Sequence, residues 1–162
     1  MAGARVTTAA VLLCVVLAGV YSVYSWRISH MPFESELHRA CYKGDIAEAR
    51  RLCEHGANVN LQGPQNWGDT PLMLAIASHS DRLSIAKMLI EYGANINLFD
   101  RSGRTPLDIA ILYGQIPIVQ LLLDHSARIN APDEEGHRPL SYAGVWTMNK
   151  PMRDFLIAHG AK

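Results

Sequence analysis

The sequence Gly103-Arg104-Thr105-Pro106-Leu107-Asp108-Ile109-Ala110 decides the fold, because the chain contains it more than once. A close copy, Gly68-Asp69-Thr70-Pro71-Leu72-Met73-Leu74-Ala75, lies 35 residues upstream. A weaker copy, Gly136-His137-Arg138-Pro139-Leu140-Ser141-Tyr142-Ala143, lies 33 residues downstream. A second motif alternates with the first: Gly56-Ala57-Asn58-Val59-Asn60, Gly93-Ala94-Asn95-Ile96-Asn97, Ser126-Ala127-Arg128-Ile129-Asn130 and Gly160-Ala161-Lys162. Self-similarity at a period of about 33 residues is typical of solenoids built from stacked units.

Within one such unit, the residue types favour a turn followed by two short helices. Gly103 permits the positive φ of a turn. Thr105 can cap a helix that begins with Pro106, where the missing N–H costs nothing, and Gly114 ends that helix. Apolar residues from Ile116 to His125 predict the second helix. Neither helix is long enough to be stable alone in water, so the units must stack.

The two alternating motifs resemble the ankyrin repeat, whose signature G-x-T-P-L-H-x-A…G-A-x-x-N is matched closely in the second and third units. The resemblance covers residues 34–162. It implies an all-α ankyrin-repeat solenoid of about four helix-turn-helix units with β-turn fingers, preceded by an N-terminal hydrophobic helix. The predicted units are 34–62, 63–97, 98–130 and 131–162.

The signature also places a histidine after Pro-Leu, which in the family ties neighbouring loops together. Met73, Asp108 and Ser141 stand at that position in this chain, so we expect the hydrogen-bond network to be altered.

The first and last predicted units depart from the repeated pattern in ways that suit the ends of a stack. The first lacks the Thr-Pro-Leu turn, and its second helix carries Arg50 and Arg51. In the last unit Arg138 replaces the threonine, and Arg153 lies where the third unit has Val119. A polar outer face is what a terminal repeat needs, so we interpret both units as caps.

The second unit is longer than the others. Two extra residues fall in the finger Leu61–Trp67, and two more fall between the helices at Ser78–Arg82. Insertions in solenoids occur in loops, often on the binding face.

An apolar segment precedes the repeats. From Val6 to Trp26 there are 21 residues without a formal charge, enough to span a bilayer as a helix. Tyr21, Tyr24 and Trp26 gather at its far end, as is typical of the membrane interface. We therefore predict a transmembrane anchor or signal sequence at residues 1–26, with the membrane contacted through residues 6–26, and a spacer at residues 27–33.

Two alternatives remain for this segment. It could be a cleaved signal peptide, because Ser22 and Ser25 both suit the residue before a cut, or it could be the hydrophobic tail of a soluble protein. Both a transmembrane anchor and a cleaved signal peptide would export the rest of the chain. We expect a single-pass membrane protein with its C-terminal domain extracytoplasmic, or a secreted or periplasmic protein if the segment is cleaved; by analogy with exported ankyrin-like proteins of bacteria, the compartment would be the periplasm.

Composition and motifs argue against catalysis and nucleic-acid binding. Lysine plus arginine and aspartate plus glutamate both number 15, so the chain lacks the basic surplus of a nucleic-acid binder. Patterns for a nucleophile elbow, a zinc protease or a phosphate-binding loop are missing from the sequence. We expect no enzyme and no cofactor. His55, His125 and His159 occupy the same position in the first, third and fourth units, at least one unit apart and too far for one metal ion, and suit helix C-termini instead.

Cysteine is sparse, with Cys14 in the apolar segment and Cys41 and Cys53 in the first unit. Cys41 and Cys53 fall at different heights of the predicted helix pair, so we expect buried free thiols. A disulfide is the alternative in an oxidising compartment.

Binding is the activity that the resemblance implies, through finger tips and first-helix residues that line a concave surface. Trp67, on the elongated finger, is the sharpest candidate anchor; the alternative is that it folds back over Pro64. The positions carried over from the family are Asn66, Trp67, Asp69, Arg101, Ser102, Arg104, Leu112, Tyr113, Glu134, Glu135 and His137.

Together these features predict a non-catalytic, monomeric module that binds a partner protein and is tethered to a membrane. Two other roles stay open: an immunity or inhibitor protein, and a structural organiser of a membrane complex. Fold alone does not choose among them.

Overall fold

The computed structural model describes residues 35–63, 67–78, 80–133, 135–145 and 150–162. All of them lie in one of the two units into which the chain divides, Phe33–Lys162. The predicted anchor at residues 1–26 and the spacer at 27–33 lie outside the described residues. Among the residues that are described, no helix is long and apolar enough to cross a membrane.

The described residues form α-helices and loops, without a strand. The helices are α2 (Glu36–Lys43), α3 (Ile46–Glu54), α4 (Pro71–Ala77), α5 (Arg82–Glu91), α6 (Pro106–Leu112), α7 (Ile116–Asp124), α8 (Pro139–Val145) and α9 (Lys150–Ala158).

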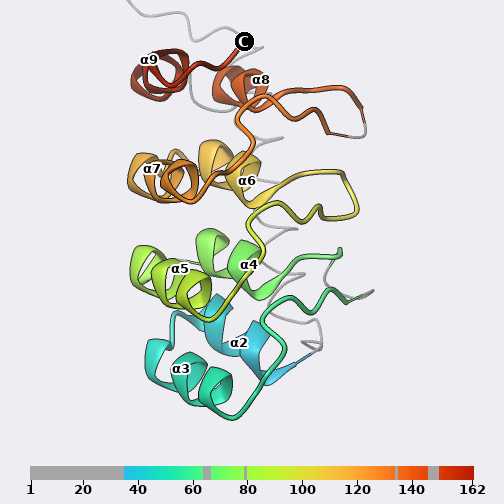
Figure 1. Cartoon of the computed structure of the whole chain (residues 1–162), viewed down its shortest axis with the longest axis vertical. Coiled ribbons are helices and arrows are strands. Elements are labelled where there is room, and N and C mark those ends of the chain that lie inside the picture. The colour runs from blue at the N-terminus through green and yellow to red at the C-terminus, as the bar shows by residue number, and fades with distance from the viewer. Residues whose placement is uncertain (1–34, 64–66, 79, 134, 146–149) are drawn as a thin grey trace, which may run out of the picture. The chain divides into compact units, whose positions relative to one another are not determined.

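These helices form antiparallel pairs stacked one on another, with loops projecting to one side as fingers (Figure 1). α2, α4, α6 and α8 form one row in which each helix contacts the next, and α3, α5 and α7 form a second row beside it. The prediction of an all-α ankyrin-repeat solenoid is confirmed, with one helix pair in each predicted unit.

The first helix of the middle units begins where local chemistry predicts. Thr105 Oγ1 accepts a hydrogen bond from Asp108 N at 3.2 Å, and Pro106 occupies the first position of α6. Thr70 and Pro71 act in the same way at α4. α7 runs from Ile116 to Asp124, within the predicted range.

The histidines before the return loops cap the second helices. His55 Nδ1 lies 2.6 Å from the carbonyl oxygen of Arg51, and His159 Nδ1 lies 2.8 Å from that of Phe155. A carbonyl oxygen only accepts, so each ring donates to a carbonyl of the last turn that also accepts the backbone N–H of the same histidine. These two rings therefore have a structural role, and His125 is the C-cap residue of α7.

The final asparagine of each G-A-x-x-N motif joins one unit to the next. The side-chain oxygens of Asn60, Asn97 and Asn130 accept backbone N–H groups of Asn95, Arg128 and Lys162, at 2.7, 3.2 and 2.8 Å. The second motif of the sequence is thus a ladder of hydrogen bonds between the loops that follow the second helices.

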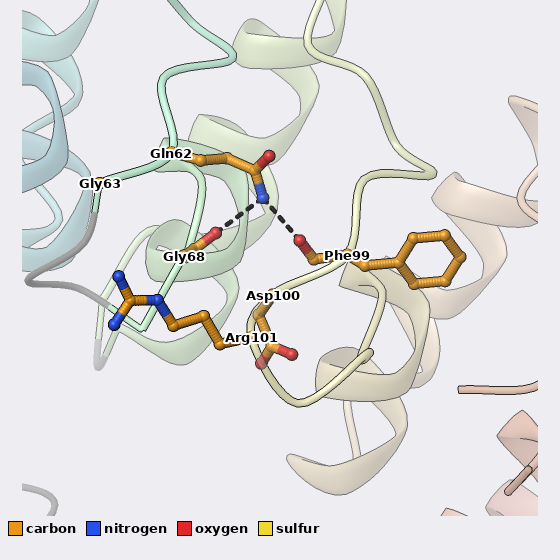
Figure 2. A pocket seen from close by; sticks show the side chains of 6 residues that line it. All are labelled: Gln62, Gly63, Gly68, Phe99, Asp100 and Arg101. Carbon is orange, nitrogen blue, oxygen red and sulfur yellow. Dashed lines mark hydrogen bonds between the residues drawn. The ribbon is translucent and has the colours of Figure 1, made fainter. Parts of the chain in front are cut away.

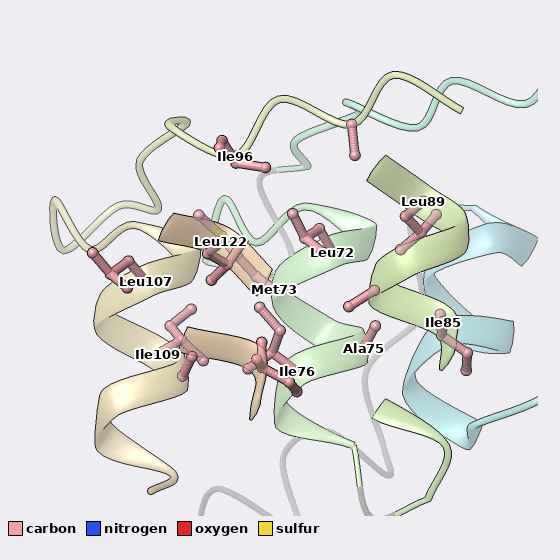
Figure 3. Close-up of a cluster of buried hydrophobic side chains, with 14 of the residues drawn as sticks. Leu72, Met73, Ala75, Ile76, Ile85, Leu89, Ile96, Leu107, Ile109 and Leu122 are labelled. Atoms are coloured by element: carbon pink, nitrogen blue, oxygen red, sulfur yellow. The ribbon is translucent and has the colours of Figure 1, made fainter. Parts of the chain in front are cut away.

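One hydrophobic core runs through the stack. Leu72 and Ile76 of α4 and Leu122 of α7 are among its fully buried side chains, and Figure 3 shows them between neighbouring helices. The core lies between the helices, and the fingers project from the side of the helix stack (Figure 1).

The insertion between the helices of the second unit is divided between loop and helix. Four residues separate Ala77 from Arg82, against three between Leu112 and Ile116, and α5 has ten residues against nine in α7. The loop also contacts the first unit, because a Cβ on Gly44 would lie 2.1 Å from Ser80 Oγ. This insertion therefore packs against the α2–α3 turn.

Candidate functional site

The finger of the third unit is a β-turn built around Asp100. Gly103 N donates to Asp100 O at 3.0 Å, and Asp100 N donates to Arg104 O at 2.9 Å. The buried Asp100 carboxylate accepts the N–H groups of Ser102 and Arg104 and forms an ion pair with the Arg104 guanidinium at 2.6 Å. These contacts hold the turn together, and Arg104 is engaged inside it.

Asp133 has the same role in the fourth finger. Its carboxylate accepts the N–H groups of Glu135 and His137 and the hydroxyl of Tyr142. Burial raises the pKa of Asp133, but these hydrogen bonds and the neighbouring His137 outweigh that effect and lower the pKa. Glu135 and His137 are therefore exposed on a fixed turn.

The fingers of the second and third units are joined to each other. Arg101 N donates to Trp67 O at 2.8 Å. Gln62 Nε2 donates to Gly68 O at 2.9 Å and to Phe99 O at 2.6 Å (Figure 2). The two fingers approach so closely that a Cβ on Gly68 would lie 3.2 Å from Arg101 N. A shallow depression between them is lined by Gln62, Gly63, Gly68, Phe99, Asp100 and Arg101.

Trp67 stands at the edge of this joined pair. Its φ is 57°, in the left-handed region that a bulky residue rarely adopts, and its side chain is 42% exposed. Pro64, over which it could have folded, lies outside the described residues.

Phe99 is exposed to a similar extent, 43%, on the neighbouring finger. Phe99 is not among the contact residues predicted from the sequence. The feature of the sequence that could have identified Phe99 is that it is a large apolar residue in an otherwise polar loop.

Asp69, one of the predicted contact residues, is buried. Its side chain is only 5% exposed, because the close approach of fingers 2 and 3 covers it. Burial and the charge of Asp100 raise the pKa of Asp69 to about 7, while Arg104 acts in the opposite direction. Asp69 Oδ1 has no hydrogen-bond partner among the described residues.

The other predicted contact residues divide between two surfaces. Arg101, Ser102, Glu135 and His137 are exposed on the fingers, whereas Arg104, Leu112 and Tyr113 are half-buried. Asn66 and Glu134 lie outside the described residues. The Arg82 guanidinium lies 5.8 Å from the Tyr113 ring centroid, which helps to fix that ring at the end of α6.

His38, which is also not among the predicted residues, occupies the position of the signature histidine in the first unit. Its Nε2 lies 3.0 Å from Leu61 O and 3.2 Å from Asp69 O, so it donates to the finger of the second unit. Ser35 Oγ lies 2.7 Å from His38 Nδ1. Ser-x-x-His repeats the spacing of Thr70 and Met73, and this register was the signal that could have found it.

In the second and third units the network is altered, as predicted. Thr70 N lies 3.4 Å from Met73 Sδ, and Thr105 N donates to Asp108 Oδ2 at 2.8 Å. Both contacts stay within their own helix caps.

Neither thiol of the first unit is suited to nucleophilic chemistry. Cys41 and Cys53 are both buried and unbonded, and burial raises the pKa of each thiol. A raised pKa disfavours the reactive thiolate. Within the described residues, no three His, Cys, Asp or Glu side chains are grouped so that they could hold a metal ion.

Comparison with protein families agrees with this geometry. A model described as ankyrin repeats in three copies matches residues 30–100, and one described as ankyrin repeats in many copies matches residues 89–143. The chain belongs to the ankyrin repeat family. Ankyrin repeats are modules for protein–protein interaction and are generally non-catalytic. A search of curated proteins gave no match.

Proposed function

We propose that this ankyrin repeat protein binds a partner protein through its fingers and the adjoining ends of α4 and α6, while residues 6–26 tether it to a membrane with the repeats outside the cytoplasm. The observation that carries the binding role is Trp67, an exposed indole on a left-handed backbone.

The cost of that conformation is the reason for giving Trp67 a binding role. A non-glycine residue in the left-handed region loses about 1–2 kcal/mol, which glycine at the same place would avoid. At 42% exposure, the residue keeps a large apolar surface in contact with water. Tryptophan is, however, enriched among the residues that dominate binding at interfaces.

The joined fingers favour tight binding for a second reason. Hydrogen bonds from Arg101 N and Gln62 Nε2 hold the backbone around Trp67 before a partner arrives. A surface that is already ordered loses less conformational entropy when it binds.

The tether rests on the sequence of the N-terminal segment. Its 21 residues without a formal charge are enough to span a bilayer, and its aromatic residues suit a membrane interface. Cleavage of the segment as a signal is the alternative, and it would leave the binding role unchanged.

Affinity capture from membranes tests both parts. The full chain, tagged at its C-terminus, is expected to retain a partner protein that Trp67→Gly retains about tenfold less well, with an unchanged or higher melting temperature. Ile157→Ser, at an exposed apolar residue of α9, is the matched control and should capture normally. Equal capture by Trp67→Gly would contradict the binding role.

The same preparation tests the tether. A mature N-terminus at residue 1 or 2, with extraction only by detergent, is expected for an anchor. A mature N-terminus at residue 23 or 26 would indicate a cleaved signal. If the captured partner is a toxin or an enzyme that the chain inhibits, the role is that of an immunity or inhibitor protein.

A further inference from the structure

We propose that fingers 2 and 3 bind a partner segment that places a carboxylate against Arg101 and an apolar side chain against Trp67. This inference rests on the proposed function and names the chemistry of its partner.

Arg101 is held beside Trp67 by the backbone. Its N–H donates to Trp67 O at 2.8 Å, and its Cγ lies 3.3 Å from the position that a Cβ on Gly68 would take. Figure 2 shows its side chain extending toward the finger of the second unit, while Phe99 points the opposite way. The residues that carry the guanidinium and the indole are therefore direct neighbours through the backbone of the two fingers.

The Arg101 guanidinium is available for a partner. It is exposed, and within the described ranges it forms neither a hydrogen bond nor an ion pair. Arg104, three residues later, is in contrast paired with the buried Asp100. The structure of finger 3 thus uses one arginine and leaves the other to solvent.

A single carboxylate fits this arrangement better than a polyanion. A guanidinium binds carboxylates through two parallel hydrogen bonds. Nucleic acid instead requires several basic groups in a row, and finger 4 presents the exposed carboxylate of Glu135. Beside Arg101, the 42% exposed indole of Trp67 offers apolar surface. An acidic residue next to an aromatic or aliphatic one satisfies both groups.

A selection from a display library of random linear peptides tests this chemistry, with the full chain in detergent as bait. Enriched peptides are expected to carry Asp or Glu next to an aromatic or aliphatic residue. Arg101→Glu as bait should enrich Lys or Arg at that place instead. Trp67→Gly should weaken the selected peptides about tenfold. Arg153→Gln, at an exposed arginine of α9, should change nothing.

Three outcomes would overturn the inference: selected peptides without an acidic residue, a selection that Arg101→Glu leaves unchanged, or no enrichment at all. Peptides that depend on Tyr113 instead of Arg101 would contradict this inference and leave the proposed function standing. Failure of both peptide selection and partner capture would contradict both. Melting temperatures of all variants, measured first, ensure that only folded proteins are compared.

Discussion

Asp69 is a carboxyl group that folding removes from water. Its pKa rises from 3.8 to about 7 through burial and the charge of Asp100, with Arg104 acting in the opposite direction. The folded chain therefore binds this proton more tightly than the unfolded chain. The resulting stabilisation is complete below about pH 4 and is lost as the pH rises toward 7.

We expect this residue to make the free energy of unfolding fall between about pH 4 and pH 7, by on the order of a few kcal/mol. Asp69→Asn removes the proton exchange, so its stability should fall less over the same range. Urea unfolding of both proteins at several pH values gives the difference, in which the contributions of other titrating groups cancel. Parallel curves for the two proteins would contradict the burial of Asp69.

Thr105 links the start of α6 to Asp108 in both directions. Its hydroxyl accepts from Asp108 N at 3.2 Å and donates to Asp108 Oδ2 at 2.7 Å. Thr105→Ala should therefore lower the free energy of unfolding by about 1–2 kcal/mol. Thr105→Ser keeps the hydroxyl and should lose less, as measured by urea unfolding. Equal losses would show that the methyl group, not the cap, stabilises this turn.

At the scale of elements, the loop between α4 and α5 packs on the turn between α2 and α3. Gly44 has a φ of 77°, and a Cβ there would meet Ser80 Oγ at 2.1 Å and Ser80 O at 2.9 Å. Gly56 has a φ of 82° with nothing within 4 Å of its would-be Cβ. Replacing each of these two glycines by alanine therefore separates the cost of backbone strain from the cost of the collision with Ser80.

Gly44→Ala should lower the free energy of unfolding by about 1–3 kcal/mol, through both strain and collision. Gly56→Ala carries only the backbone strain, so it should lose less in the same urea titration. If the two variants are equally destabilised, the contact between the two loops is absent in solution.

The elements themselves follow from local chemistry, and the sequence predicts them well. The ends of α6 are set by residues close to them in the sequence, namely Thr105, Pro106 and Gly114. These ends could therefore be predicted without knowledge of the neighbouring units. The Ser35 cap of α2 is equally local, whereas the hydrogen bonds of His38 reach Leu61 and Asp69; its register with Met73 was the signal that could have found it.

Burial on the fingers depends instead on how closely neighbouring units approach. Asp69 is covered because the finger of the third unit lies against Gly68. The residues of the second unit's finger do not by themselves determine how closely the two fingers approach. The exposure of Phe99 likewise depends on how closely the neighbouring units approach. The insertion before Arg82 was predicted as a loop, but its division between loop and helix depends on packing against Gly44. The sequence thus defines the units, while stacking defines which finger residues a partner can reach.

At the scale of the whole molecule, stability is a sum over units and the contacts between neighbours. Leu122 of α7 is fully buried in the common core, whereas Leu123 beside it is half-buried. Leu122→Ala should lower the free energy of unfolding by about 2–5 kcal/mol, with a smaller loss for Leu123→Ala. Guanidinium unfolding followed by circular dichroism measures both. The reverse order would show that the assigned register of α7 is wrong.

The central claim is that the repeats form a scaffold and that the finger around Trp67 contacts the partner. A photo-crosslinking amino acid placed at position 67, and in a second protein at Ile157 on α9, tests this in intact cells. Both positions are exposed and apolar, at 42% and 49%. We predict a discrete crosslinked protein from position 67 and none from position 157. A crosslink from position 157 alone, or from neither position, would contradict the claim.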